Sequence, residues 1–125
     1  MGLSRHAFGV ALLVASAACA GHHHHAPPDP PVDIPLKVTN RGWFDVTVYV
    51  LHDGQRTRIG LVTGSSEQDF VLPARLLGQS HQLALLGEAI GNNDVARTET
   101  LNIQPGQYIE WTLETNLRRS SVGVY

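Results

Sequence analysis

Cysteine is almost absent from this chain, and so are several patterns that mark function. Cys19 is the only cysteine among 125 residues, so no disulfide can form within the chain and a packed core has to stabilise the fold. Charged residues make up only 16% and are scattered in both signs, which excludes the basic stripe that nucleic-acid binding requires. No Gly-rich phosphate loop, paired-cysteine spacing or Asp-rich calcium loop occurs. We therefore predict a protein without a cofactor and without a nucleic-acid partner.

Candidate catalytic side chains are also few. Beyond the first 25 residues the histidines are His52 and His81. His52 lies next to a predicted turn, where a polar residue is ordinary. Ser80 and His81 are neighbours at the start of a predicted strand, so their side chains point to opposite faces and do not form a nucleophile–base pair. We therefore predict that the protein is not an enzyme.

The N-terminal segment has the pattern of a secretory signal peptide. Arg5 and His6 precede an uncharged, mostly apolar run at residues 7–18. This run is too short to cross a bilayer as a helix, which needs about 20 apolar residues. We predict that residues 1–18 are a signal peptide and that the protein is exported.

Cys19 follows small residues at the end of that run. The sequence Ser16-Ala17-Ala18-Cys19 resembles the lipobox of bacterial lipoproteins, with Ser16 in place of the usual aliphatic residue. The resemblance implies that Cys19 is the lipid attachment site, and Ala20 after it implies anchoring in the outer membrane. Two alternatives stay open: cleavage after Ala20 at an A-x-A site, giving a soluble periplasmic or secreted protein, and an uncleaved anchor.

Residues 19–34 are predicted to be a lipid-anchored linker rich in histidine and proline. The density of prolines favours an extended, semi-rigid spacer. Four consecutive imidazoles, which suit Zn, Ni or Cu, come from His22, His23, His24 and His25. A contiguous run lacks the fixed spacing of a preformed metal site, so we predict a polar spacer, with metal binding by the run as the alternative.

Residues 43–63 are predicted to form a β-hairpin closed by Asp53 and Gly54. Asp-Gly between two alternating apolar runs favours a two-residue type I′ turn, which fixes the register. The pairs expected on the inner, apolar face are His52–Gln55, Val50–Thr57, Val48–Ile59, Val46–Leu61 and Phe44–Thr63. The pairs expected on the outer face are Leu51–Arg56, Tyr49–Arg58, Thr47–Gly60 and Asp45–Val62.

Short alternating runs continue along the chain at roughly even spacing. The elements expected outside the hairpin include strands at residues 34–40, 68–72 and 82–86, a single helical turn at 74–77, and a final strand with Val122, Val124 and Tyr125. In total this gives about seven or eight short strands. The prediction is an all-β domain over residues 35–125, an antiparallel β-sandwich of immunoglobulin-like or similar Greek-key type.

The same alternation predicts which side chains face the core. The expected inward set is Leu36, Val38, Phe44, Val46, Val48, Val50, Ile59, Leu61, Phe70, Leu72, Leu83, Leu85, Leu101, Ile103, Ile109, Trp111 and Leu113. A set of that size can support a domain of this length without disulfides.

Pro105 and Gly106 mark a turn in the last third of the chain. A hairpin there would set Ile103 opposite Tyr108 and Leu101 opposite Glu110, which spoils the apolar match. We therefore predict that a type II turn passes the chain from one sheet to the other. The stretch is similar to the E–F corner of immunoglobulin-like and fibronectin type III-like sandwiches. That similarity implies that Tyr108 bonds back to upstream backbone.

Trp43, Tyr49 and Arg58 form the candidate binding surface, on the outer face of the predicted hairpin. The structural interpretation is cross-strand stabilisation, with Arg58 stacked on Tyr49. The functional interpretation is a binding platform, because exposed aromatics with arginine are typical of interface hot spots.

As a whole the chain resembles small envelope lipoproteins of Gram-negative bacteria that have one sandwich domain, a family of unassigned function. The resemblance rests on the Cys19 region, the hairpin and the Pro105-Gly106 turn, and it implies a location and a fold but no substrate or small-molecule ligand. We predict a non-enzymatic cell-envelope module that contacts a protein partner and is held off the membrane by the spacer. The alternatives are a glycan-binding module that stacks sugars on Trp43 and Tyr49, and metal binding by the histidine run.

Overall fold

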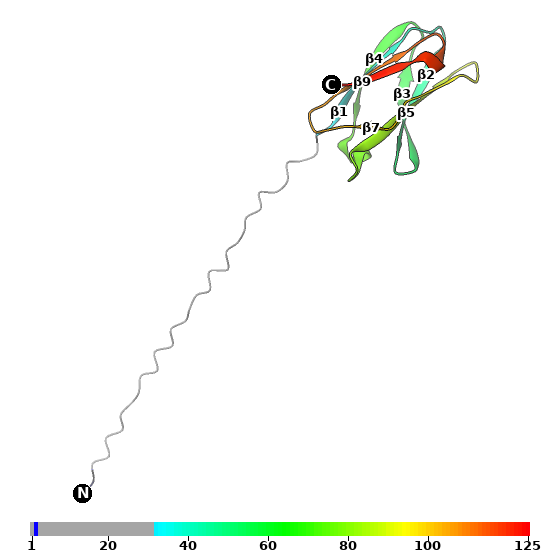
Figure 1. Cartoon of the computed structure of the whole chain (residues 1–125). Coiled ribbons are helices and arrows are strands. Elements are labelled where there is room, and N and C mark those ends of the chain that lie inside the picture. The colour runs from blue at the N-terminus through cyan, green and yellow to red at the C-terminus, as the bar shows by residue number, and fades with distance from the viewer. Residues whose placement is uncertain (1, 3–31) are drawn as a thin grey trace.

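The computed structural model describes Gly2 and residues 32–125. In this part the chain forms nine strands and two 3-10 helices, arranged as two sheets packed face to face (Figure 1). No helix among these residues is long and apolar enough to cross a bilayer. The predicted all-β sandwich is confirmed, with more strands than the seven or eight expected.

The first sheet has the strand order β4-β1-β8-β9. Its strands are β1 (Ile34–Asn40), β4 (Ser66–Leu72), β8 (Ile109–Leu113) and β9 (Ser121–Val124). All neighbours are antiparallel except β1 and β8, which run parallel. A parallel pair needs a long crossover, and here the whole second sheet lies between β1 and β8 along the chain.

The second sheet has the order β3-β2-β5-β6, and β7 also pairs with β5. Its strands are β2 (Val46–His52), β3 (Gln55–Val62), β5 (Gln82–Ala89), β6 (Val95–Arg97) and β7 (Leu101–Asn102). The 3-10 helix η1 (Ala74–Leu77) is the predicted helical turn, and η2 (Leu117–Arg119) precedes β9. All pairs in this sheet are antiparallel.

The β2–β3 hairpin is closed by the predicted turn. Asp53 and Gly54 have φ angles of 48° and 70°, as a type I′ turn requires. The four pairs nearest the turn, from His52–Gln55 to Tyr49–Arg58, have the predicted register. Turn chemistry therefore sets the register over this half of the hairpin.

A β-bulge at Ile59 changes the register over the other half. Val48 pairs with Gly60 and not, as predicted, with Ile59. Ile59 therefore has no partner in β2. The ring of Phe70 from β4 covers Gly60, where a Cβ atom would lie 2.7 Å from the ring Cε1. A side chain at position 60 would collide with this ring. Glycine therefore occupies this inward-facing position, and the Phe70 ring fills the space over it.

The bulge reverses which residues of β3 face the core. Val62 is fully buried, whereas Leu61 is 39% exposed, so the predicted inward position of Leu61 is wrong. The prediction for Phe44 is also wrong, since its side chain is 48% exposed. The ladder between β2 and β3 begins at Val46, and Phe44 belongs to the preceding loop.

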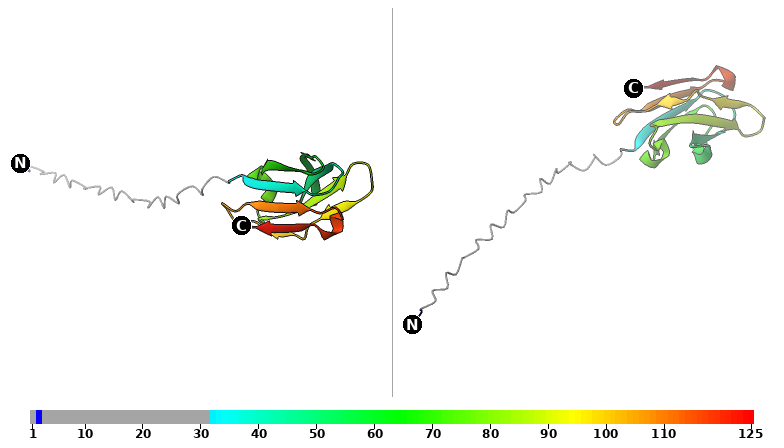
Figure 2. Two further views of the ribbon diagram at one scale, coloured as in Figure 1. Left: turned by 90° about the horizontal axis from the view of Figure 1, so that it is seen from above. Right: turned by 60° about the horizontal axis from the view of Figure 1, so that its bottom comes forward.

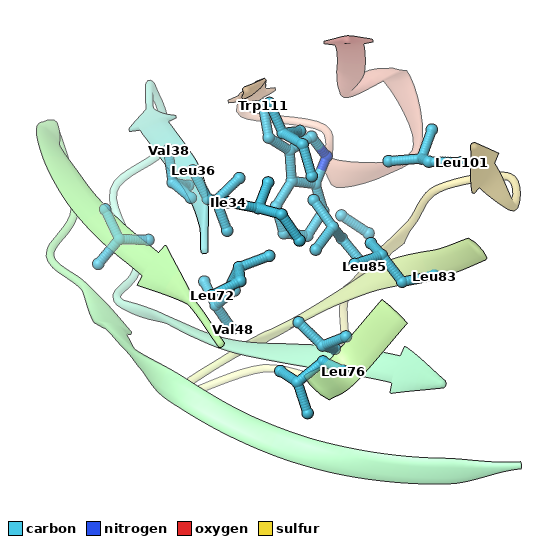
Figure 3. Close-up of a cluster of buried hydrophobic side chains, with 14 of the residues drawn as sticks. Ile34, Leu36, Val38, Val48, Leu72, Leu76, Leu83, Leu85, Leu101 and Trp111 are labelled. Carbon is cyan, nitrogen blue, oxygen red and sulfur yellow. The ribbon is translucent and has the colours of Figure 1, made fainter. Parts of the chain in front are cut away.

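One apolar core fills the space between the sheets (Figure 3). Trp111 of β8 is 2% exposed and lies over Gly87 of β5, where a Cβ would be 3.1 Å from the indole Cη2. The remaining predicted core positions are confirmed, with Ile59 and Phe70 only partly buried. The core residues that the alternation missed are Ile34, Val62, Leu76, Leu77, Ala96 and Leu117.

The turn at Pro105 and Gly106 carries the chain from β7 in the second sheet to β8 in the first, as predicted. Gly106 has a φ of 86°, and the Gln107 amide donates to the Gln104 carbonyl oxygen at 3.1 Å, which is a type II turn. The Tyr108 ring stacks on Tyr125, with 5.5 Å between ring centroids. Within residues 32–125 the Tyr108 hydroxyl makes no hydrogen bond to upstream backbone, so the corner bond implied by the resemblance is not formed there.

Comparing two neighbouring positions of β3 tests the bulged register. We expect Val62→Ala to lower the free energy of unfolding by about 2 kcal/mol, because it removes fully buried methyl groups and leaves a cavity. Leu61→Ala should cost less than about 1 kcal/mol, because that side chain is partly solvated. Urea denaturation of both variants measures the difference. A larger loss of unfolding free energy for Leu61→Ala than for Val62→Ala would indicate the regular register and contradict the bulge.

Candidate binding surface

The most exposed aromatic side chain of the described residues lies in the loop of residues 41–45, which joins β1 to β2 and so connects the two sheets. Trp43 is 84% exposed, and the neighbouring Phe44 is 48% exposed. Phe44 rests on Gly91 of the β5–β6 loop, where a Cβ would lie 3.2 Å from the ring. Ile90 of the same loop is 53% exposed, and its amide donates to the Asp45 carbonyl oxygen at 2.8 Å. Two loops therefore meet at this end of the domain and present apolar side chains to solvent.

The side chain of Asn40 fixes the path of this loop. It is 2% exposed, and its Nδ2 donates to the carbonyl oxygen of Phe44 at 2.8 Å and, more weakly, to that of Val62 at 3.4 Å. Its Oδ1 accepts from the amide of Gly42 at 2.9 Å. One buried amide thus holds the backbone on both sides of Trp43 and ties the loop to the end of β3.

A second set of contacts braces the loop against the β3–β4 turn. The Gly64 amide donates to Asp45 Oδ1 at 2.9 Å, and the Ser65 amide donates to the Gly42 carbonyl oxygen at 2.8 Å. A Cβ at position 64 would collide with the carbonyl oxygen of Trp43. Glycine is required there because the two backbones approach so closely.

A small hollow of about 70 Å³ opens beside the indole. Its lining includes Trp43, Phe44, Asn92, Asp94, Glu114 and Thr115, and we call these six residues the Trp43 surface. Among residues 32–125, Asp94 and Glu114 are the only charged residues that line the hollow. Glu114 Oε1 accepts from Arg41 Nη1 at 3.1 Å, so one carboxylate is partly neutralised and the other has no ion-pair partner among the described residues.

The structure separates Trp43 from the other two residues of the predicted site, because Trp43 lies in the loop before β2 and its predicted place on the outer face of the hairpin is wrong. Tyr49 and Arg58 are opposite one another on β2 and β3, as expected. The cation over the Tyr49 ring, however, is Arg56, at 4.0 Å from the centroid, so the predicted stacking of Arg58 is wrong. Arg56 reaches across Tyr49 because Glu88 on β5 binds its guanidinium, with an Nη1–Oε1 distance of 2.7 Å. These contacts have the geometry of cross-strand stabilisation.

Trp43 and Tyr49 do not form one platform. Tyr49 is three residues beyond Val46, where β2 begins, which places it about 10 Å along the strand from the end that carries the Trp43 loop. Tyr49 is also half-buried beneath Arg56. The shared aromatic groove that glycan stacking on both residues would need is therefore absent from the described part of the chain.

A wider hollow of about 490 Å³ lies at the opposite end, beside the Asp53-Gly54 turn. Its lining includes Arg56, Arg97 and His52. The His52 ring is mostly buried, and its Nε2 lies 2.8 Å from Thr57 Oγ1. Its Nδ1 is 3.8 Å from Asp53 Oδ2 and forms no hydrogen bond within the described residues. The position of His52 next to the turn is the one expected from the sequence.

Two predicted sites fall outside the described residues: the lipid attachment at Cys19, and the histidine run at His22, His23, His24 and His25. The predicted signal peptide at residues 1–18 falls there too except for Gly2, and so does most of the linker. Within residues 32–125, no three side chains of His, Cys, Asp or Glu come together as a metal site.

Comparison with known proteins leaves the family open. No protein-family model matches the sequence, and no curated protein matches it. Among solved structures the chain is similar to the NMR structure of a protein from Eubacterium rectale, with 16% sequence identity and a TM-score of 0.45. The match covers 79% of this chain and 92% of that one. A likeness of this degree does not extend to function.

Mutations can show that Asn40 stabilises the fold and that the exposed Trp43 side chain does not. We expect Asn40→Ala to lower the free energy of unfolding by about 3 kcal/mol, because it leaves buried backbone groups of the loop without partners. Trp43→Ala should change it by less than about 0.5 kcal/mol, since the indole is almost fully solvated. Asn93→Ala, at an exposed asparagine, is the matched control and should also be near neutral. Chemical denaturation measures all three. If Trp43→Ala lowered the free energy of unfolding as much as Asn40→Ala, the indole would be packed against the domain, which would contradict its exposure to solvent.

Proposed function

We propose that this protein is a non-enzymatic binding module of the bacterial cell envelope and that the Trp43 surface contacts a protein partner. One observation carries the proposal: an indole that is 84% exposed stands on a loop whose backbone is held by Asn40, Asp45 and Gly64. Tryptophan is enriched among the residues that dominate binding energy at protein interfaces.

The energetics favour a contact role for Trp43. Burying a tryptophan removes roughly 150–250 Å² from water, which is worth roughly 4–6 kcal/mol of apolar transfer free energy. The Trp43 side chain is mostly exposed, so folding of the domain gains little of this free energy. A partner that covers the indole can gain it on binding. Because the loop is already held in one conformation by hydrogen bonds, binding loses little backbone entropy.

The orientation of the domain supports the same proposal. The chain enters the sandwich at Val32, and the loops that carry Trp43, Asn92 and Thr115 lie at the other end (Figure 2). We propose, as the Cys19 region suggests, that the chain is lipid-anchored at Cys19 in the outer membrane. The Trp43 surface would then face away from the bilayer, where a partner can reach it.

A protein partner accounts for this surface better than a glycan. Sugar stacking over an extended site uses several aromatic faces, and here Trp43 and Tyr49 lie on different parts of the domain. The hollow of about 70 Å³ is also small beside the pockets of roughly 300–1,000 Å³ that usually hold small-molecule ligands. Kinship with immunoglobulin-like envelope lipoproteins is part of the proposal, supported by the Pro105-Gly106 turn that changes sheets.

Site-specific photo-crosslinking in cells tests the proposal. With p-benzoylphenylalanine at position 115, next to the hollow, we expect one discrete crosslinked adduct that is isolated with membranes. Trp43→Ala in the same background should abolish it, because the principal contact is lost. Tyr125→Ala should not, since Tyr125 is an exposed aromatic elsewhere on the domain.

Two results would contradict parts of the proposal separately. An adduct that persists unchanged in Trp43→Ala would remove the Trp43 surface from the interface. Cys19→Ala is expected to move the protein from the membrane to the soluble fraction, and its retention in the membrane would refute the lipid anchor while leaving the interface untouched.

A further inference from the structure

The charges around the hollow indicate what kind of group it receives. Two carboxylates, Asp94 and Glu114, line it, and no lysine, arginine or histidine of the described part of the chain does. Neighbouring cations are Arg41, bound to Glu114 at 3.1 Å, and Arg118, which lines an adjacent hollow together with Asp94. Asp94 nevertheless has no ion pair within 4.0 Å among the described residues. The hollow therefore has one carboxylate that forms no ion pair with the described residues, and an exposed indole forms part of the same lining.

An exposed indole together with a carboxylate favours binding of a cation. A positive group next to an indole gains about 0.5–1 kcal/mol at an exposed site and about 2 kcal/mol or more when water is excluded. A carboxylate of the protein that accepts a hydrogen bond from the same positive group adds a charge-assisted hydrogen bond. At about 70 Å³ the hollow is far smaller than the pockets of roughly 300–1,000 Å³ that hold small-molecule ligands, and it can take the end of one side chain.

We propose that the hollow of the Trp43 surface receives the guanidinium of an arginine side chain on the protein partner. Arginine is favoured over lysine because a planar guanidinium can stack on an aromatic face while it donates to a carboxylate, and because it is less strongly hydrated than an ammonium. This inference rests on the proposed function and names the chemistry of the partner's anchoring residue.

Asp94 can be altered without disturbing the loop that carries it. Within the described residues its hydrogen bonds use only the backbone: its amide donates to Asn92 Oδ1 at 2.8 Å, and its carbonyl oxygen accepts from the Ala89 amide at 3.1 Å. Asp94→Asn therefore removes the charge and keeps the shape. Asp69→Asn is the matched control, because Asp69 is an exposed carboxylate on β4 away from the hollow.

The test is a titration of the ¹⁵N-labelled full chain with N-acetyl-arginine methylamide, followed by NMR. We expect a saturable shift of the Trp43 indole Nε1–H with millimolar affinity, while the buried indole of Trp111 stays unchanged. The uncharged isostere N-acetyl-citrulline methylamide should bind about tenfold more weakly, because it loses the interactions with both the indole and the carboxylate. Asp94→Asn should weaken the arginine probe about threefold, and Asp69→Asn should not.

Equal affinity for the arginine and citrulline probes, or equal affinity of the wild type and Asp94→Asn for arginine, would overturn the inference. Affinity for N-acetyl-lysine methylamide as high as for the arginine probe would overturn the choice of guanidinium. The photo-crosslink at position 115 separates this inference from the proposed function. An adduct that needs Trp43 but forms equally well in Asp94→Asn refutes the arginine and leaves the interface standing, whereas an adduct that ignores Trp43 refutes the interface itself.

Discussion

The buried amide of Asn40 is the contact on which the binding end of the domain depends. Asn40 is the last residue of β1 in the first sheet. Its side chain donates to the carbonyl oxygen of Phe44, in the loop before β2, and to that of Val62, the last residue of β3 in the second sheet. Apolar burial holds the two sheets together, but it is non-directional and does not set the path of an exposed loop. Directional hydrogen bonds do so, and they determine where Trp43 stands.

Local chemistry predicted those parts of the fold that depend on neighbouring residues. The bounds of β1, the type I′ turn at Asp53-Gly54 and the change of sheet at Pro105-Gly106 all follow from short stretches of sequence. The bulge at Ile59 does not, because it depends on a ring from β4, Phe70, that fills the space over an inward-facing glycine. Alternation alone cannot show that a distant side chain replaces a local one, so it placed the wrong residue of β3 in the core.

The candidate site could be predicted only in part for the same reason. The residue type of Trp43 marks it as a candidate for binding, but the sequence places it on the outer face of the hairpin, whereas it lies in the loop before β2. Asp94 and Glu114 follow different strands, and nothing in the sequence shows that β5 and β8 end at the same end of the sandwich as the Trp43 loop. Strand alternation places Tyr49 on the same outer face as Trp43, but Arg56 covers the Tyr49 ring. Alternation applies only within a strand, and Trp43 lies outside β2.

The central claim is that an exposed tryptophan stands on a rigid loop, and ¹⁵N relaxation of the backbone amides tests it most directly. If the hydrogen bonds of Asn40, Asp45 and Gly42 hold the loop, order parameters of residues 41–45 should be about 0.85, as in the flanking strands. Order parameters below about 0.6 over these residues, with the strands remaining rigid, would show a flexible loop and contradict the account.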